Sequence, residues 1–433
     1  MSDKKKPDVI IIDPESKKQT EQQKKPVTMG ERMRHVVTLA LFCVFALLVG
    51  IATGCLDALF GIILLKVSDI RESFPYWLIP FLPAAGLLLY FMYDRFGKET
   101  KEGMNLVFGQ AQNSKTNIRL RLIPFVTLST WITHLFGGSA GREGVAVQIG
   151  GTLGSFASRY IDKRHADAKR VMTIAGMAAG FAGLFRTPMA AVFFASEVIC
   201  AGRLEVNALL PALIAAYVAS FVSGLLGLER FTFDLGIDVE LSPVLIAVLC
   251  MSGILFGIVG GGFAFLLRLA KKKLAVLLKN PYIRIAAGGA FVSVISLLLY
   301  SGRYSGLGTN LINDALAGNV YYYDFILKFI LTVVTISVGF QGGEVTPLFA
   351  IGATLGAVIG IIFNLPVVLF AALGYAAVFG SATNTLIAPM FIGIEVFGYR
   401  YTPYFFAVCA LAYIFNGNNS IYSKQRKITI RHA

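Results

Sequence analysis

Long apolar segments recur along the whole chain and are separated by short polar segments. A helix needs about 20 apolar residues to cross a bilayer, so several segments suit one crossing, others are too short, and two could hold a helical pair. Continuous segments of this length argue against a β-barrel, whose strands alternate apolar and polar positions. The pattern therefore predicts an all-α polytopic membrane protein with ten or more membrane helices of uneven length. The segments are residues 35–65, 76–93, 121–136, 171–200, 206–228, 244–267, 283–300, 325–340, 347–380 and 401–415.

Composition supports a membrane protein and locates its charge. Of 433 residues, 56% are apolar and 15% charged, and the mean hydropathy is +0.68. The formal net charge of +14 is concentrated in tails and loops, such as residues 162–170, 271–273 and 424–433. By the positive-inside rule these segments are cytoplasmic, so we expect both termini in the cytoplasm. The basic charge then does not imply a nucleic-acid partner. We expect the protein to lie in the plasma membrane. Residues 1–34 carry nine Lys/Arg against six Asp/Glu, and we expect a basic cytoplasmic tail without a secretory signal.

Two short patterns occur twice in the same order. The pattern "IGGTLG" at 149–154 recurs as "IGATLG" at 351–356, and "GFAGLF" at 180–185 recurs as "GYAAVF" at 374–379, at offsets of 202 and 194 residues. Chance is the alternative, because glycine and alanine are common in membrane helices. We expect one transmembrane domain over residues 35–423, built from duplicated halves at about 36–230 and 242–423.

Each half has one acid just before its repeated glycine pattern. Glu143 lies in "GREG" and Glu344 in "GGEVTP". A glycine-broken helix start exposes unpaired N–H groups and the positive end of the helix dipole, which together bind anions. A third such start lies in "KEGMNLVFG", at Gly103, Met104 and Asn105. A carboxylate at such a site can occupy the anion's place until protonation releases it.

Purely structural roles for these residues remain alternatives at this point. Glu143 could simply pair with Arg142, and the glycines could only allow close helix packing. His134 is expected to be packed or hydrogen-bonded rather than a ligand, and Glu197 and Glu395 are expected to be structural acids. The chain has no HExxH, no GxSxG and no paired helical aspartates, and its cysteines lack metal-type spacing. We therefore expect no enzyme activity, no catalytic residue, no cofactor and no metal.

Several motifs resemble one known family. The stretch "GREGVAVQIGG" resembles the "GREGP" signature of the CLC chloride channel and transporter family, and "GGEVTPLFAIGATLG" is similar to its "GGIFAP" region. The segment 180–198 also matches, and Tyr422 falls where the family has an inner-gate tyrosine. The resemblance covers about residues 36–423. It implies an inverted repeat of broken, tilted helices and a homodimer in the lipid bilayer with a separate pore in each subunit.

Three departures from the family pattern point to one of its branches. Met104 replaces the anion-facing serine of "GSGIP", Val145 replaces the proline of "GREGP", and Glu344 replaces an apolar residue. All three match the CLC-F branch, which exports fluoride in exchange for protons. Val198 stands where chloride/proton exchangers have an internal proton-relay glutamate, so a separate inner proton route is in doubt.

The resemblance assigns the expected roles. The leading hypothesis is a fluoride/proton antiporter, and the alternatives are a fluoride- or chloride-conducting CLC channel, a chloride/proton exchanger, or a proton-coupled transporter of another solute. Glu143 and Glu344 are the expected gating and proton-carrying residues. The expected anion-binding residues are Gly103, Met104, Asn105, Gly144, Val145, Val345, Thr346 and Tyr422.

Overall fold

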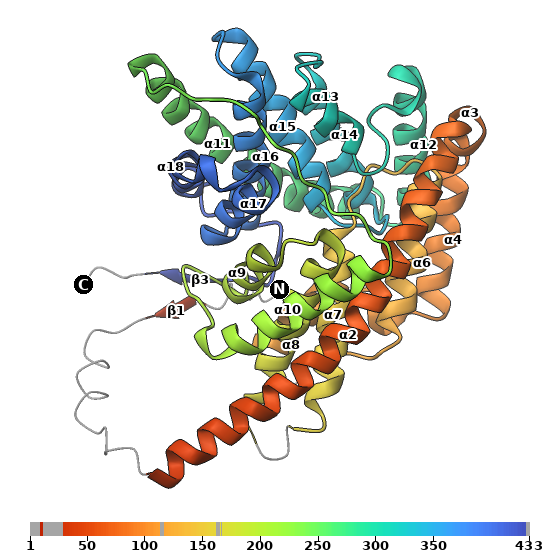
Figure 1. Ribbon diagram of the computed structural model, residues 1–433. Helices are drawn as coiled ribbons and strands as arrows, with labels where there is room; N and C mark the ends of the chain where they lie inside the picture. Colours follow the sequence, from red (N-terminus) through yellow and green to blue (C-terminus); the bar gives the residue numbers. More distant parts are fainter. Residues whose placement is uncertain (1–8, 12–28, 113–116, 162–164, 166, 430–433) are drawn as a thin grey trace.

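The structure is a computed structural model, and it describes residues 9–11, 29–112, 117–161, 165 and 167–429 (Figure 1). Helices dominate it. Those of the first half are α2 (Met29–Ser73), α3 (Pro75–Leu78), α4 (Leu82–Arg95), α5 (Met104–Gln112), α6 (Leu122–Leu135), α7 (Glu143–Ser158), α8 (Ala168–Phe185), α9 (Pro188–Glu197) and α10 (Leu209–Leu225). Those of the second half are α11 (Pro243–Leu277), α12 (Pro281–Leu298), α13 (Thr309–Leu316), α14 (Asp324–Val338), α15 (Val345–Ile362), α16 (Val367–Thr383), α17 (Ile387–Phe397) and α18 (Thr402–Ile414).

Local sequence explains where several helices begin and end. Helices α11 and α12 start with proline in the first turn, after Ser242 and Asn280, whose side chains accept hydrogen bonds from the N–H groups of Leu245 and Tyr282. Helices α8 and α16 both end at a residue in the left-handed conformation, Arg186 and Asn384. Matching ends on these two helices are a first sign that the halves repeat one another.

The recurring glycine patterns lie at two equivalent helix crossings. Helix α7 packs against α8, and α15 packs against α16. A Cβ atom on Gly154 would overlap the carbonyl oxygen of Met172, and one on Gly356 would overlap that of Phe370. Only glycine allows this approach, so the repeated glycines are explained by close packing of the two crossings.

Helices α9 and α17 complete the repeat by capping each other. The carboxylate of Glu197, at the end of α9, accepts hydrogen bonds from Leu386 N and Ile387 N at 2.5 and 3.0 Å, at the start of α17. Glu395, near the end of α17, accepts bonds from Met189 N and Ala190 N at the start of α9. This reciprocal exchange is the pseudo-twofold relation of an inverted repeat. It also confirms the expectation that both glutamates are structural acids.

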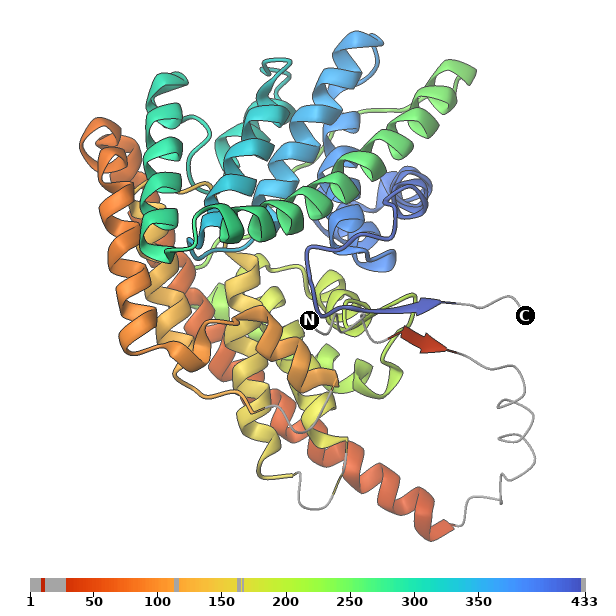
Figure 2. The same cartoon turned by 180° about the vertical axis from the view of Figure 1, so that it is seen from behind.

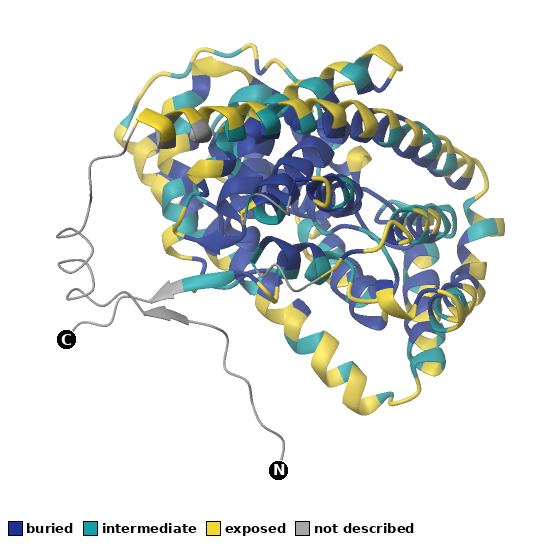
Figure 3. Cartoon of the chain, turned by 90° about the horizontal axis from the view of Figure 1, so that it is seen from below, coloured by how far each residue is buried: buried dark blue, intermediate teal, exposed yellow. Residues whose placement is uncertain are grey.

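Among the described residues, six helical segments are long and apolar enough to cross a membrane, and three shorter apolar helices accompany them, Leu122–Leu135, Val367–Thr383 and Ile387–Phe397. Helices α7, α8 and α16 are almost completely buried, whereas α6, α14 and α18 keep exposed apolar side chains, such as those of Leu128, Ile330 and Ile414. Buried residues fill the middle of the protein and exposed residues lie around them (Figure 3). Helix α15 runs through the interior, because 89% of its apolar window is buried, whereas only 28% of the window of α2 is buried. Broken helices at membrane depth are tolerated where protein surrounds their ends.

A small parallel sheet was not expected from the sequence. Strand β3 (Arg426–Thr429) pairs with β2 (Cys200–Ala201) on one side and with β1 (Val9–Ile11) on the other. Figure 2 shows β1 and β3 side by side. The sheet joins the segment after α9 to the segment after Tyr422. The fold is therefore helical with one small added sheet. Most of the predicted tail 1–34, and the last four residues of the predicted tail 424–433, lie outside the described residues.

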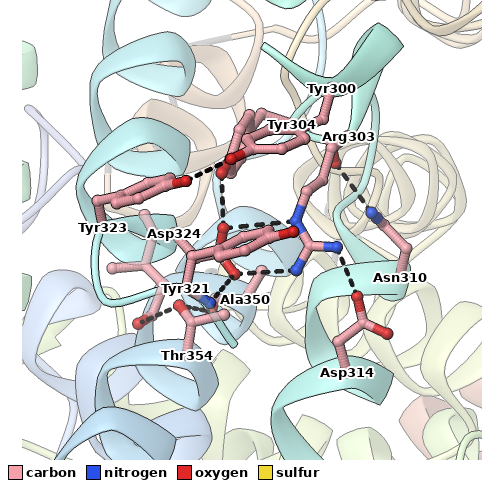
Figure 4. Close-up of polar contacts among 11 residues, drawn as sticks. Tyr300, Arg303, Tyr304, Asn310, Asp314, Tyr321, Tyr323, Asp324, Ala350 and Thr354 are labelled. Carbon is pink, nitrogen blue, oxygen red and sulfur yellow. Dashed lines mark hydrogen bonds and ion pairs between the residues drawn. The ribbon is translucent and has the colours of Figure 1, made fainter. Parts of the chain in front are cut away.

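A polar network holds the connections between α12, α13 and α14 (Figure 4). Asp324 is fully buried and accepts hydrogen bonds from Arg303, Tyr304 and the Tyr321 N–H group at 2.9, 2.6 and 3.0 Å. Arg303 also pairs with Asp314 at 2.7 Å. Burial alone lowers the pKa of Arg303, but the hydrogen bonds and charges of the two aspartates outweigh it and raise that pKa. The guanidinium therefore stays charged.

We expect Asp324→Asn to lower the free energy of unfolding by about 3 kcal/mol, because it leaves a partly buried guanidinium without its main partner. Thermal unfolding in detergent measures the loss. Asp314→Asn is the matched control. Asp314 is more exposed, with 37% of its side chain accessible, and its removal should cost less than about 1 kcal/mol. Equal destabilisation by the two variants would contradict the assigned importance of Asp324.

Candidate functional site

Two glycine loops, one from each repeat, are hydrogen-bonded to each other inside the protein. Gly141 N donates to Gly343 O at 2.5 Å, and Gly343 N donates to Gly141 O at 2.7 Å. A Cβ on Gly343 would lie 2.9 Å from the nitrogen of Gly144, so a larger residue could not approach this closely. Helix α7 begins just after the first loop and α15 just after the second. We call this paired arrangement the clasp.

Glu143, the first residue of α7, reaches across the clasp to the start of α15. Its side chain is fully buried. The Thr346 hydroxyl lies 2.6 and 2.5 Å from its two carboxylate oxygens, and Thr346 N donates to Oε2 at 3.1 Å. A carboxylate therefore occupies the N-terminus of α15, where backbone N–H groups and the helix dipole favour an anion.

Arg142 is the neighbour with which Glu143 was expected to pair if its role were only structural. Its Nε atom lies 3.8 Å from Glu143 Oε1, which is an ion pair but not a hydrogen bond. Two of the guanidinium nitrogens, Nε and Nη1, are buried without a hydrogen-bond partner. Arg142 N also donates to Glu143 Oε2, at 3.3 Å, but the shorter hydrogen bonds of Glu143 go to Thr346 of the opposite repeat.

Lys328 supports the loop that leads to the clasp. This lysine is fully buried, and its Nζ donates to Ser139 Oγ at 3.0 Å, to Tyr304 O at 3.1 Å and to Gly306 O at 2.7 Å. It thereby joins the loop before Glu143 to the polar network of Figure 4. His134 Nε2 lies 3.4 Å from Gly141 O, which agrees with the expectation of a packed, hydrogen-bonded histidine.

A cavity of about 690 Å³ lies beside the clasp. Helices α5, α7, α11 and α12 contribute to its wall, together with the loop before α15 and the segment after α18. Its charged residues are mostly basic. They are Lys101, Glu102, Arg268, Lys271, Lys272, Arg284 and Glu344.

Six of the expected site residues line this cavity. They are Gly103, Met104, Asn105, Gly144, Glu344 and Tyr422. Glu143 and Thr346 lie behind Gly144, in the clasp. The structure therefore brings the start of α5, the start of α7 and the start of α15 to one place, as the three glycine-broken helix starts predicted.

Val145 and Val345 do not line the cavity. Val145 is fully buried in an apolar cluster with Phe60 and Leu184, and its N–H group donates to Arg142 O at 3.1 Å. Neither its side chain nor its N–H group is available to an anion in this conformation, so its expected role in anion binding is not supported. Val345 is also buried, in the main apolar core.

Tyr422 closes one side of the cavity and is fixed by aromatic packing. Its ring stacks on Phe108 of α5, with ring centroids 5.0 Å apart, and meets Phe194 of α9 edge-on at 6.2 Å. The next residue, Ser423, donates to Asn105 Oδ1 at 3.0 Å. The tyrosine is therefore held against the start of α5, beside the expected anion path.

Sequence reasoning missed Gln148 and the role of the basic residues of α11 and α12. Gln148 donates from Nε2 to Gly144 O at 3.1 Å, and its Oε1 is buried without a partner and lies close to Gly103. Its signal was present, because it is the one polar side chain in "GVAVQIGG". The lysines at 271–273 were interpreted only as cytoplasmic charge. Among the described residues, no group of three or more His, Cys, Asp or Glu side chains is arranged to hold a metal ion.

The comparisons with known proteins agree on the type of fold. A sequence-family model described as voltage gated chloride channel matches residues 85–417. The chloride/fluoride channel protein of Pseudomonas syringae pv. tomato is 36% identical over 400 residues, which cover 90% of this chain and 87% of the relative.

Solved structures give the same result. The crystal structure of a CLC-type fluoride/proton antiporter is 47% identical, with a TM-score of 0.86, over 93% of this chain and 100% of that chain. A slow cyanobacterial Cl−/H+ antiporter is similar in fold, with a TM-score of 0.74 at 19% identity, over 87% of this chain and 94% of that chain.

Proposed function

The chain belongs to the voltage-gated chloride channel family, and on that premise we propose that it is an antiporter that exchanges fluoride for protons across a membrane. One observation carries the proposal. The carboxylate of Glu143 is held by Thr346 at the N-terminus of α15, in the place where an anion would bind. The similarity to a fluoride/proton antiporter at 47% identity, against 19% for a chloride/proton antiporter, favours fluoride.

The exchange follows from competition for the same donors. Fluoride is small and strongly hydrated, so a site for it must replace water with close hydrogen-bond donors. The N–H and hydroxyl groups of Thr346 are such donors, and Glu143 now occupies them. Protonation removes the charge of Glu143 and weakens its hold, so that fluoride can take its place. Each fluoride that passes then requires a protonation event at Glu143.

The cavity provides the path from the clasp to the aqueous phase. We assign Gly103, Met104, Asn105 and Gly144 to its wall, with Tyr422 as the gate at its inner side. Glu344 is the second proton-carrying acid, since it lines the cavity directly next to the clasp. The backbone at Val345, between Glu344 and Thr346, belongs to the same anion site.

The proposed orientation places the cavity on the cytoplasmic side. The basic residues along its wall fit the positive-inside rule, and they attract anions from the cytoplasm. Arg284 and the network of Arg303 lie at opposite ends of α12, whose 18 residues span about 27 Å, so that network faces outward. We further propose a plasma-membrane location, cytoplasmic termini and a homodimer with one pathway per subunit, which the family resemblance supports.

Flux measurements in liposomes test the function. Purified protein is reconstituted, and a fluoride electrode and a pH-sensitive dye record both ions at once. We expect an imposed proton gradient to drive fluoride uphill. Failure of the proton gradient to move fluoride would indicate a channel, and equal transport of chloride and fluoride would overturn the fluoride assignment.

A further inference from the structure

Lys271 forms an ion pair with the inner acid of the proposed pathway. Its Nζ atom lies 3.9 Å from Glu344 Oε1. Lys271 belongs to α11, and Glu344 directly precedes α15, so the pair joins two helices across the cavity wall. About half of the lysine side chain is accessible, against 16% of the glutamate side chain. Both residues line the cavity, and the lysine is the more exposed of the two.

The side chains of Lys272 and Lys273 point in other directions than that of Lys271. Successive side chains on a helix point about 100° apart, so a run of three lysines cannot face one site. Lys271 and Lys272 both line the cavity, whereas Lys273 is not part of its wall. Only Lys271 of this triplet is within ion-pair distance of Glu344 among the described residues. The triplet thus supplies two control positions with the same charge on the same turn of helix.

The other charged groups around the cavity have partners elsewhere or lie on other parts of its wall. Lys101 pairs with Asp94 at 3.0 Å, and Glu102 pairs with Lys424 at 2.9 Å. Arg268, one turn before Lys271, donates to Asn419 Oδ1 at 3.1 Å. The remaining groups that face Glu344 or the cavity are Glu143 from α7, Lys272 from α11, Arg284 from α12 and Tyr422 from the segment after α18.

We propose that Lys271 is a positioning residue for the exchange and that it switches partners between Glu344 and the transported anion. The inference rests on the proposed function, in which Glu344 carries a proton. When Glu344 is ionised, the ammonium group of Lys271 holds it at the cavity wall. When Glu344 carries a proton, the same ammonium group is free to attract fluoride from the cytoplasm. Release of the proton to the cytoplasm restores the ion pair after fluoride has moved on.

The pair makes proton release depend on the lysine charge in a defined direction. A neighbouring cation stabilises an ionised carboxylate, so Lys271 favours loss of the proton from Glu344. Without that cation, Glu344 keeps its proton up to a higher internal pH. Exchange in Lys271→Met should therefore need a higher internal pH. We expect the internal pH at which the exchange rate is half-maximal to rise by roughly one unit, which is a tenfold change in proton concentration.

The experiment compares Lys271→Met with two variants of equal charge loss, Lys272→Met and Lys273→Met. Fluoride efflux and proton influx are recorded in liposomes over a series of internal pH values. We expect the pH shift only in Lys271→Met, with recovery in Lys271→Arg and rates within about twofold of wild type in Lys273→Met. In a Glu344→Gln background, Lys271→Met should cause no further shift. The same pH profile in Lys271→Met and Lys272→Met would overturn the inference, because a general surface charge would then explain the effect.

A second measurement separates this inference from the proposed function. Infrared spectroscopy of protein labelled with [13C]glutamate detects carboxyl protonation at equilibrium, and the difference from Glu344→Gln isolates Glu344. A shifted titration in Lys271→Met supports the ion pair even if the wild type shows no exchange, and only the proposed function then fails. An unshifted titration in a wild type that exchanges the two ions would leave the function standing and exclude the switching role of Lys271.

Discussion

Glu143→Gln should abolish proton coupling while fluoride still crosses the membrane. Glutamine has nearly the shape of glutamate, so it can occupy the clasp, but it carries neither a charge nor an exchangeable acid proton. A neutral amide competes less strongly with fluoride for the N–H and hydroxyl groups of Thr346. We expect fluoride to run down its gradient with less than about a tenth of the wild-type proton movement per fluoride, because glutamine binds and releases no proton at this position.

A second acid provides the control for this variant. Glu102 lines the cavity and pairs with Lys424, but it does not contact the clasp. Glu102→Gln should keep the wild-type ratio of protons to fluoride. Simultaneous recording with a fluoride electrode and a pH dye gives the ratio directly. Uphill fluoride transport by Glu143→Gln under a proton gradient would remove Glu143 from its assigned role.

The repeat could be predicted from the sequence because its cause is local. Close helix crossings demand glycine at fixed spacing, so the patterns at 149–154 and 351–356 recur wherever the crossing recurs. The sequence does not tell which helices face lipid, because an apolar segment looks the same whether lipid or protein surrounds it. Helices α15 and α2 differ in burial, not in apolar character. The sheet was not predictable, since segments as short as Cys200–Ala201 carry no periodicity.

The sequence predicted which helix starts meet, but it did not predict the direction in which each side chain points. Glu143 and Glu344 stood out as acids beside glycines, and both lie at helix starts that meet. Val145 follows Glu143 in the sequence but points into an apolar cluster, because adjacent residues on a helix face different sides. The sequence does not distinguish Lys271 from the two lysines that follow it. The structure does, because α11 passes the start of α15 so that Lys271 pairs with Glu344.

The hydroxyl of Thr346 offers the sharpest test of the competition between carboxylate and fluoride. Thr346→Val keeps the side-chain shape and the backbone N–H group but removes the donor that lies 2.6 and 2.5 Å from the two oxygens of Glu143. A hydrogen bond to a charged group contributes about 1.5–3 kcal/mol. The same donor serves Glu143 and fluoride in turn, so its loss in the wild-type background weakens the binding of both, and the two effects on the exchange rate oppose each other.

The effect of the hydroxyl on fluoride binding can be measured alone when the carboxylate is removed first. Glu143→Ala vacates the place at the start of α15, and fluoride binding can be titrated by calorimetry without its competitor. In that background Thr346→Val should weaken fluoride binding by roughly 10- to 100-fold, which corresponds to the loss of one charged hydrogen bond. Thr346→Ser keeps the hydroxyl and should stay within about threefold of the Glu143→Ala value. Unchanged affinity in Glu143→Ala/Thr346→Val would mean that fluoride binds elsewhere, and that Glu143 blocks the pathway without standing in for the anion.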